Sequence, residues 1–368
     1  MMNKRKPTNQ LCIGTYYLAP YARTPKHVQQ LAECGIDFIV NIPNNQELLD
    51  QLSKHGVHAI VNGIFPGWFG GDGSNAGTMS TQNPIEKYNL ATSSFVDHPA
   101  IWGIDTGDEP SLLDFPHYGK IFERVSEQVP HLQPYLNIYP SYAVKGSNSA
   151  EEVKNQLGTD DYSYYIEEYC KYVPSDYICF DYYPYSASLD GLYHSLNVVS
   201  AACKKYNREL WMVLQVNSID PELWVSEDQL RFQAFTAMAY GATTLTWACY
   251  TAGWWYNHVL DKEGNPTEQY DKLKKVNAEI HTLSTEYMKY KHVRTSFEGD
   301  LLIGEMEKDD TDKGFFITAS NAGADLSFEN NGNTFAVYSY NNKSLDTIDG
   351  IHHLHLEPFE AVFLTCKK

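Results

Sequence analysis

Eight short apolar runs, rich in branched and aromatic residues, recur along the chain up to Tyr250, and segments with helical periodicity lie between them. The runs are Leu11–Tyr17, Phe38–Ile42, His58–Phe65, Ile101–Asp105, Pro134–Tyr139, Tyr177–Tyr182, Leu210–Val216 and Thr243–Tyr250. Because they are apolar nearly throughout, they are typical of parallel strands that helices cover on both faces. Eight strands alternating with helices predict an α/β fold, a (β/α)8 barrel.

Two of the intervening segments carry clear helix-start signals. Ser226-x-x-Gln229 is a capping box, and Pro84 predicts the start of a helix that runs to about Phe95. A doubly wound open sheet is the rival architecture. It requires a glycine-rich phosphate turn after the first strand, where this chain has Tyr16-Tyr17-Leu18-Ala19-Pro20, so the sequence favours the barrel.

The pattern changes at about Phe297, after a predicted connecting helix over Glu268–Tyr290. Short alternating strands follow, separated by turns such as Asn330-Asn331-Gly332. They are Leu301–Met306, Gly314–Ser320, Thr334–Tyr340, His352–Leu356 and Phe359–Thr365. We therefore predict a catalytic barrel over residues 1–294 and a small C-terminal antiparallel β-sandwich over residues 295–368.

The charge balance excludes two classes of partner. The chain has 28 Lys and Arg against 46 Asp and Glu, a formal net charge of −18, which disfavours a nucleic-acid-binding face and a polybasic membrane anchor. No apolar run approaches the ~18 residues that span a bilayer. No secretory signal follows the polar start Met1–Gln10, so we expect a cytoplasmic protein, or an extracytoplasmic one if a signal has been removed.

The 7 cysteines include no C-x-x-C pair, and those inside apolar runs, such as Cys179 and Cys249, are predicted to be small buried hydrophobic side chains.

The active sites of such barrels lie at the carboxyl ends of the strands, so the residues that end each run are the candidates. In chain order they are Tyr16, Asn41, Asn62, Asp105, Asp108, Glu109, Asn137, Asp181, Tyr183, Gln215, Trp247 and Tyr250. Carboxylates, amides and aromatic rings without lysine or arginine favour a neutral polyhydroxylated ligand over a phosphorylated one. No cofactor is implied.

The adjacent carboxylates Asp108 and Glu109 are the strongest chemical signal. At a buried strand end they repel each other and lose water, and both effects raise one pKa, as a general acid near neutrality requires. Alternatively, Asp-Glu-Pro110 begins the next helix, with the acids at its amino-terminal dipole. Asp105 either lines the rim or supports Glu109 from behind. Asp181 either is a rim acid or holds the turn after it.

Aromatic residues make up 14% of the chain, with 27 Tyr and 7 Trp, and such rings stack on sugars. Trp247, Tyr250, Trp254 and Trp255 are therefore candidate subsite platforms; the alternative is an aromatic core beneath the barrel mouth. Trp68 lies in a glycine-rich segment that either caps a bound sugar or is a plain surface insertion.

A metal site is not expected. His352, His353 and His355 form a cluster in the sequence, but we expect alternation to place His353 on the opposite face of a terminal strand from the other two. A solvated strand is the better interpretation of this cluster.

Five stretches of the sequence carry a family resemblance. Trp-Gly-Ile-Asp-Thr-Gly-Asp-Glu-Pro over 102–110 and Phe-Asp-Tyr-Tyr-Pro-Tyr over 180–185 resemble barrel glycoside hydrolases related to clan A, in which Asn-Glu-Pro on strand four carries the acid/base Glu. Segments 229–242, 261–270 and 276–280 resemble β-galactosidase-like hydrolases, so the likeness covers most of the chain. It implies a glycoside hydrolase whose general acid is Glu109.

The chain departs from that pattern at two positions. Gln215 stands where clan A enzymes place a nucleophilic Glu at the end of strand seven, and Asp108 replaces the Asn before the acid. Three mechanisms remain open. Asp108 orients a substrate 2-acetamido group that attacks internally, as the similar Gly-Asp-Glu of β-N-acetylhexosaminidases implies; or Asp181 partners Glu109 as nucleophile or base; or catalysis has been lost.

We therefore predict a hydrolase that acts on an oligosaccharide or glycoconjugate of a neutral or 2-acetamido sugar. Glu109 is the expected acid, assisted by Asp108 or Asp181. Gln215, Asn137, Tyr183 and Trp247 are expected to orient the sugar. The alternative is a non-catalytic carbohydrate-binding barrel without the strand-seven nucleophile.

Overall fold

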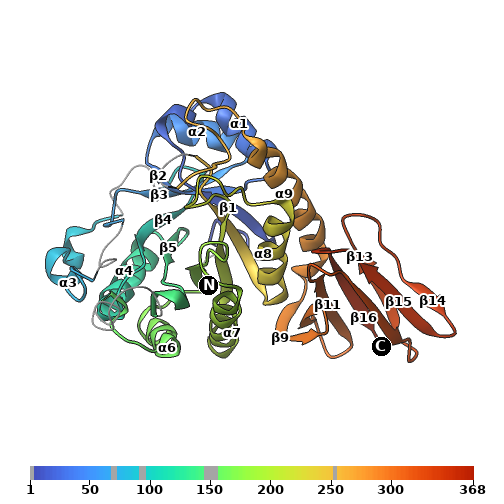
Figure 1. The fold of residues 1–368 in the computed structure, drawn as a ribbon. Helices are drawn as coiled ribbons and strands as arrows, with labels where there is room; N and C mark the ends of the chain where they lie inside the picture. The colour runs from blue at the N-terminus through green and yellow to red at the C-terminus, as the bar shows by residue number, and fades with distance from the viewer. Residues whose placement is uncertain (1–3, 68–72, 91–96, 145–155, 252–254) are drawn as a thin grey trace.

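Eight parallel strands form one sheet that curls into a barrel, in the order β5-β4-β3-β2-β1-β8-β7-β6 (Figure 1). The computed structural model describes residues 4–67, 73–90, 97–144, 156–251 and 255–368. The strands are β1 (Cys12–Tyr16), β2 (Phe38–Pro43), β3 (His58–Asn62), β4 (Ile101–Asp108), β5 (Gln133–Asn137), β6 (Tyr177–Asp181), β7 (Glu209–Gln215) and β8 (Ala242–Ala248). The two edge strands meet through a parallel bridge between Ile138 and Phe180, which brings the barrel close to closure. The predicted α/β barrel is confirmed.

Helices cover the outside of the barrel and follow the strands in alternation (Figure 1). They are α1 (Pro25–Glu33), α2 (Gln46–Lys54), α3 (Met79–Gln82), α4 (Phe115–Gln128), α6 (Tyr162–Tyr172), α7 (Leu189–Tyr206), α8 (Glu227–Ala239) and α9 (Glu268–Tyr287), with 3₁₀ turns η1 (Pro20–Ala22), η2 (Ile85–Lys87), η4 (Leu112–Asp114) and η5 (Ser141–Val144). The Ser226 capping box forms as predicted, because Ser226 and Gln229 each accept the other's backbone N–H.

The helix predicted after Pro84 does not form within the described residues. Only the 3₁₀ turn η2 follows Pro84, and residues 91–96 lie outside the described part of the chain. The backbone N–H of Leu90 donates to Oε1 of Gln128 on α4 (2.7 Å) rather than to a carbonyl of its own turn. A tertiary contact has replaced the local helix.

Large side chains fill the interior of the barrel near the amino ends of its strands. Phe38, Trp102, Tyr177 and Trp211 are all buried, and the rings of Tyr177 and Trp211 stack with centroids 3.8 Å apart. The amino-terminal arm lies against this layer. Lys6 is only 5% exposed, and its Nζ sits 4.5 Å from the centre of the Trp211 ring, a cation–π contact.

Two antiparallel sheets follow α9 and pack face to face, as the predicted sandwich requires. Their strands are β9 (Lys291–Glu298), β10 (Leu301–Glu307), β11 (Asp312–Ala319), β12 (Ala324–Glu329), β13 (Thr334–Tyr338), β14 (Asp346–Ile348), β15 (Ile351–Leu356) and β16 (Ala361–Lys367). The sheet orders are β13-β16-β11-β10-β9 and β12-β15-β14. Strands β9, β12 and β14 were not predicted. Strand β9 runs from 291 to 298 and therefore includes residue 294. The division of the chain into two domains at that residue stays a prediction.

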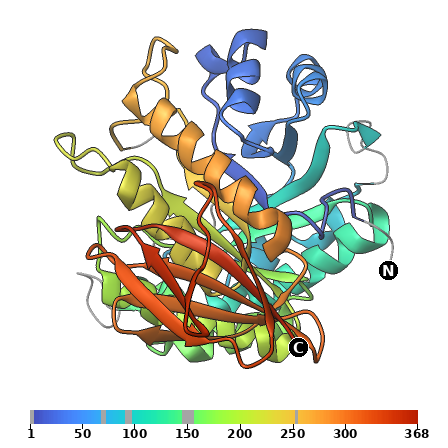
Figure 2. The ribbon, with the colours of Figure 1, turned by 90° about the vertical axis from the view of Figure 1, so that its right-hand side faces the viewer.

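The five-stranded sheet packs against helices of the barrel (Figure 2). Phe316 of β11 and Phe363 of β16 both meet the ring of Tyr287 on α9, with centroids 5.6 and 5.9 Å apart. Phe235 of α8 lies 6.1 Å from Phe316. One hydrophobic cluster therefore includes side chains of the barrel and of the sheet.

Gly304 on β10 lies at a close approach of the sheet to the barrel. A Cβ at this position would fall 2.1 Å from the carbonyl oxygen of Ala239, the last residue of α8. We expect Gly304→Ala to lower the free energy of unfolding by about 1–3 kcal/mol, because the backbones must separate. Urea unfolding checks the value, with Gly67→Ala as control, since a Cβ at Gly67 meets nothing within 4 Å. Equal stability of the two variants would contradict the expectation.

The histidines of β15 correct one prediction. His352 is 9% exposed and packs between the rings of Phe328 and Phe335, whereas His353 and His355 lie on the more exposed face. The expected alternation was wrong, since residues two apart share a face and His352 is the one that differs. Within the described residues, no group of three or more His, Cys, Asp or Glu side chains is placed to hold a metal ion. In the same part of the chain, no helix is long and apolar enough to cross a membrane.

Candidate active site

Strand β4 delivers Asp108 and Glu109 to the carboxyl end of the barrel, where both side chains are partly exposed. Glu109 adopts a left-handed backbone conformation (φ +44°), and its N–H donates to the carbonyl oxygen of Asn137 on β5 (2.9 Å). Helix α4 begins only at Phe115, so the alternative in which Asp-Glu-Pro starts that helix is wrong. Strained backbone of this kind concentrates at functional sites, where the surrounding structure holds it in place.

Gly107 makes this strand end possible. Its φ of +147° lies in a region that only glycine readily adopts, and a Cβ there would fall 2.4 Å from the hydroxyl of Tyr118 on α4. The fully buried Tyr118 ring thus packs directly beneath the turn that presents the two carboxylates. The backbone conformation at this position and the contact with Tyr118 therefore explain why the Gly-Asp-Glu triplet begins with glycine.

Asp181, at the end of β6, meets this pair from the neighbouring strand. Glu109 and Asp181 both bond to Asn137, whose carbonyl accepts the N–H of Glu109 and whose side chain lies against Asp181. Nδ2 of Asn137 donates both to Asp181 Oδ1 (2.8 Å) and to Asp108 Oδ1 (3.1 Å). Asp181 thus belongs to the acid cluster, with its side chain buried (2% exposed), and its role as a rim acid stays a prediction. Asn137 links the carboxylates and does not face outward as the predicted sugar contact.

The three carboxyl groups differ in proton affinity. Burial raises the pKa of Asp181 to about 6, while hydrogen bonds from Asn137 and Tyr142 limit the rise. Burial, and then the charge of Asp181, raise the pKa of Asp108 to about 7. Burial and the charges of Asp181 and Asp108 raise the pKa of Glu109 well above its ordinary value. Near pH 6.5 this order of pKa values favours a protonated Glu109 beside an ionised Asp181.

Asp105 lies below the rim, 7% exposed, and its Oδ1 accepts the N–H of Gly107 (3.1 Å). It therefore supports the acid turn from behind. Burial, and then the charge of Asp108, raise its pKa to about 8.

This pKa makes the folded state lose stability as pH rises. Between about pH 4 and pH 8 folded Asp105 keeps a proton that the unfolded chain releases, so its contribution falls through that range. We expect Asp105→Asn to raise the free energy of unfolding at pH 8 by a few kcal/mol and to change it little at pH 4, since one pKa unit corresponds to about 1.4 kcal/mol. Urea unfolding at both pH values checks this. The exposed Asp160→Asn is the control, and an equal gain at both pH values would contradict the assignment.

Four other predicted contacts stand around the mouth of the barrel, each partly exposed. The hydroxyl of Tyr16 hydrogen-bonds that of Tyr135 inside the barrel (2.6 Å). Nδ2 of Asn62 donates to Oδ1 of Asn41, across the ends of β3 and β2. Tyr183 meets the ring of Trp255 edge-on, with centroids 4.6 Å apart. Amides and rings therefore surround the acids.

Gln215 is not available to a ligand. It is fully buried, and its Oε1 accepts the N–H of Tyr185 (3.1 Å) while its Nε2 donates to Ser186 Oγ (3.1 Å) and to the carbonyl of Asn217 (3.0 Å). The amide at the end of β7 ties neighbouring loops together. The prediction that it orients a sugar is corrected accordingly.

Trp247 and Tyr250 are core residues and not platforms, since neither is exposed to solvent. Trp247 points outward from β8, and its Nε1 donates to Oδ1 of Asn277 on α9 (2.9 Å). Both rings belong to the hydrophobic cluster between the strands and the helices. The predictions for Trp68 and Trp254 fall on residues outside the described part of the chain.

The sequence analysis missed Tyr142. It lies on η5, in the connection after β5, and its hydroxyl donates to Oδ2 of Asp181 (3.2 Å). It therefore helps to keep that carboxylate ionised. The only sequence signal for Tyr142 is its position shortly after Tyr139, the last residue of the apolar run of strand five.

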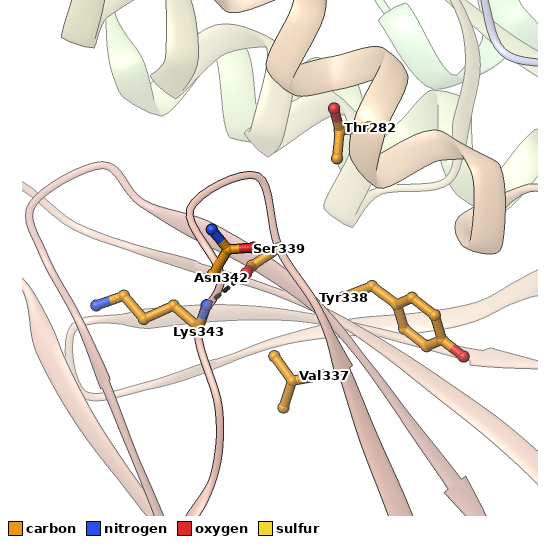
Figure 3. A pocket seen from close by; sticks show the side chains of 6 residues that line it. All are labelled: Thr282, Val337, Tyr338, Ser339, Asn342 and Lys343. Atoms are coloured by element: carbon orange, nitrogen blue, oxygen red, sulfur yellow. Dashed lines mark hydrogen bonds between the residues drawn. The ribbon is translucent and has the colours of Figure 1, made fainter.

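Two surface hollows lie elsewhere. One of about 390 Å³ opens between α9 and β13 and is lined by Thr282, Val337, Tyr338, Ser339, Asn342 and Lys343 (Figure 3). The other, of about 260 Å³, lies beside α7 and β9. Neither is lined by a carboxylate, so we assign no acid–base chemistry to them.

Solved structures with little sequence similarity share this architecture. A family 39 glycoside hydrolase from Bacteroides cellulosilyticus gives a TM-score of 0.53 at 10% identity, with 98% of this chain and 81% of that chain covered. An α-amylase from H. orenii gives 0.54 at 9% (97% and 99% covered), and α-galactosidase I from Mortierella vinacea gives 0.50 at 10% (98% and 98%). This chain has the fold of the (β/α)8 glycoside hydrolases.

The likeness extends over both the barrel and the terminal sheets, since each of these structures covers nearly the whole chain. No protein-family model and no curated protein matches the sequence. The three similar structures carry three different names, so the fold alone does not select a substrate. The chemistry has to be argued from the acid cluster.

Proposed function

We propose that the protein is a glycoside hydrolase in which Glu109 protonates the leaving oxygen and Asp181 is its ionised partner. The cluster of Glu109 and Asp181 around Asn137 carries this proposal, because the pKa of Glu109 is raised further than that of Asp181, which favours one protonated and one ionised member near neutrality. Two carboxyl groups whose environments set their pKa values apart are what glycoside hydrolysis requires.

The proposed mechanism is the retaining one, in which the second carboxylate attacks the sugar directly and the two carboxyl groups stand roughly 5–5.5 Å apart. What supports it is that Asn137 bonds to both residues, through its carbonyl to the N–H of Glu109 and through Nδ2 to Asp181, so the two acids belong to one cluster. In the first step Asp181 attacks the anomeric carbon while the Glu109 proton passes to the departing oxygen. In the second, water attacks the glycosyl ester on Asp181, Glu109 takes the proton of that water, and Asp181 leaves as carboxylate.

The substrate class follows from the polar groups around the acids. Tyr16, Asn41, Asn62 and Tyr183 supply hydroxyls, amides and rings. The main influences on the pKa values of the acids are burial, other carboxylates and hydrogen bonds, not cations. We therefore propose a neutral sugar, or a 2-acetamido sugar if Asp108 orients the acetamido group for internal attack.

A panel of 4-nitrophenyl glycosides tests the proposal. It comprises the α and β anomers of glucose, galactose, mannose, xylose and N-acetylglucosamine, with product configuration followed by proton NMR. Hydrolysis with retention of a sugar that lacks the acetamido group supports Asp181 as nucleophile. Turnover confined to N-acetylglucosaminides would indicate that the substrate's own acetamido group is the nucleophile and that Asp108 orients it. Sugar binding without any turnover would establish the non-catalytic alternative.

A further inference from the structure

Three large apolar side chains are exposed on the two loops that follow β7 and β8. Ile219 is 53% exposed, Trp224 37% and Tyr256 51%. Both loops lie at the carboxyl end of the barrel, the end that carries Glu109 and Asp181. Exposed apolar side chains scattered singly are ordinary, but a group of them on the functional face marks a binding surface.

The two loops are fixed to each other. Ser218 and Tyr256 exchange backbone hydrogen bonds (3.1 and 2.7 Å). Nδ2 of Asn257 donates to the carbonyls of Pro221 (3.0 Å) and Leu223 (2.7 Å). Each of the three exposed side chains therefore lies on, or next to, a residue that bonds across the loops. The surface is ordered before any ligand arrives, which lowers the entropic cost of binding.

This surface continues from the acid site. Trp255, which precedes Tyr256, contacts Tyr183 edge-on at 4.6 Å, and Tyr183 follows Asp181 by two residues. The charge of Asp181, after burial, also helps to raise the pKa of Tyr183. A path of rings thus leads from the acid pair to the exposed loop face.

We propose that Ile219, Trp224 and Tyr256 form a platform for a second sugar ring of the substrate, next to the ring whose bond is cleaved. This inference rests on the proposed function and extends it to substrates of two or more sugar units. A pyranose offers a C–H face that packs on rings and a rim of hydroxyls. The platform offers the matching groups, because polar side chains border its apolar ones. Asp220 and Glu222 are exposed on the same loop, and the Nζ of Lys272 lies over the Trp224 ring, 5.8 Å from its centre.

A protein partner fits this surface less well. Stable protein interfaces bury about 800 Å² on each side, with roughly 20–30 residues contributing. Three side chains on two short loops offer far less. An oligosaccharide needs a much smaller contact area, about one aromatic ring face for each sugar unit that it binds.

The test measures binding, so it does not depend on turnover. Cellotetraose, mannotetraose, xylotetraose, galactotetraose and chitotetraose are titrated by calorimetry into the Glu109→Gln protein. Trp224→Ala and Tyr256→Ala are then made in that background. We expect each substitution to raise the Kd of the bound tetrasaccharide about five- to tenfold. The factor by which it raises the Kd of the matching monosaccharide should be at least three times smaller. Tyr164→Ala is the matched control, since Tyr164 is 48% exposed on α6, and it is expected to leave the Kd unchanged.

The outcomes separate the two proposals. Unchanged Kd values in Trp224→Ala and Tyr256→Ala, or no binding of any of the five tetrasaccharides, would overturn the platform. Tetrasaccharide binding that depends on Trp224 in a protein that cleaves no glycoside would retain the platform and remove the proposed hydrolase activity. Thermal melting of each variant verifies that its fold is intact.

Discussion

The Glu109→Gln protein is expected to hydrolyse 4-nitrophenyl glycosides about 10³-fold more slowly than the wild type, with its fold unchanged. General acid catalysis typically contributes 10²–10⁴-fold to a rate. Glutamine has nearly the same shape as glutamate and is also a hydrogen-bond donor, so it removes the transferable proton and little else. The measurement is kcat on the glycoside that the panel identifies.

The leaving group provides the stringent control. A 2,4-dinitrophenolate departs without protonation, so the loss in Glu109→Gln is expected to shrink at least tenfold on the dinitrophenyl glycoside. Glu123→Gln, an exposed carboxylate on α4, serves as the matched surface variant and is expected to retain the wild-type rate. An undiminished rate in Glu109→Gln, or an equal loss on both leaving groups, would remove Glu109 from the role of proton donor.

The Asp181→Asn protein is expected to lose about 10⁴-fold or more in kcat, and equally on both leaving groups. A nucleophile is needed however easily the phenolate departs, and removal of enzymic nucleophiles has effects of this size. In Asp181→Ala, azide should restore part of the rate by attacking from the vacated side. The product is then a glycosyl azide of configuration opposite to the substrate. Asp160→Asn is the control, and a rate loss without azide rescue or inverted product would contradict the nucleophile assignment.

The same assignment fixes the acid side of the pH profile. The pKa of Asp181 is raised to about 6, and protonation removes its nucleophilic electron pair, so kcat/KM of the wild type is expected to fall as pH drops below about 6. At higher pH the carboxylate stays ionised and the limit passes to the proton on Glu109. A profile that is flat from pH 7 to pH 4 would contradict the role of Asp181.

The barrel was accessible to sequence reasoning because its strands are buried on both faces. The apolar runs that begin at Leu11, Phe38 and Leu210 each overlap an observed strand almost completely. The terminal strands were harder to detect. β9 has a burial pattern with little alternation, and β14 is only three residues long, so neither carries a clear period-two signal.

The candidate acids were also visible in the sequence, since Asp108, Glu109 and Asp181 each follow a buried strand. Their mutual arrangement was not, because the link from Asp108 through Asn137 to Asp181 depends on how closely β4 and β6 approach across β5. The aromatic predictions failed at Trp247 for a related reason. Whether the last residues of β8 face the interior or α9 depends on strand register, which composition does not reveal.

The layer of Phe38, Trp102, Tyr177 and Trp211, with Lys6 against it, packs the barrel interior near the amino ends of its strands. Side chains therefore fill this end of the barrel, opposite to the end that carries the acid pair. In the proposed hydrolase, substrate enters and products leave at the carboxyl end of the barrel, where the loops that carry Trp224 and Tyr256 lie. Side chains on those loops then influence how fast a cleaved sugar departs as well as how well an intact one is held.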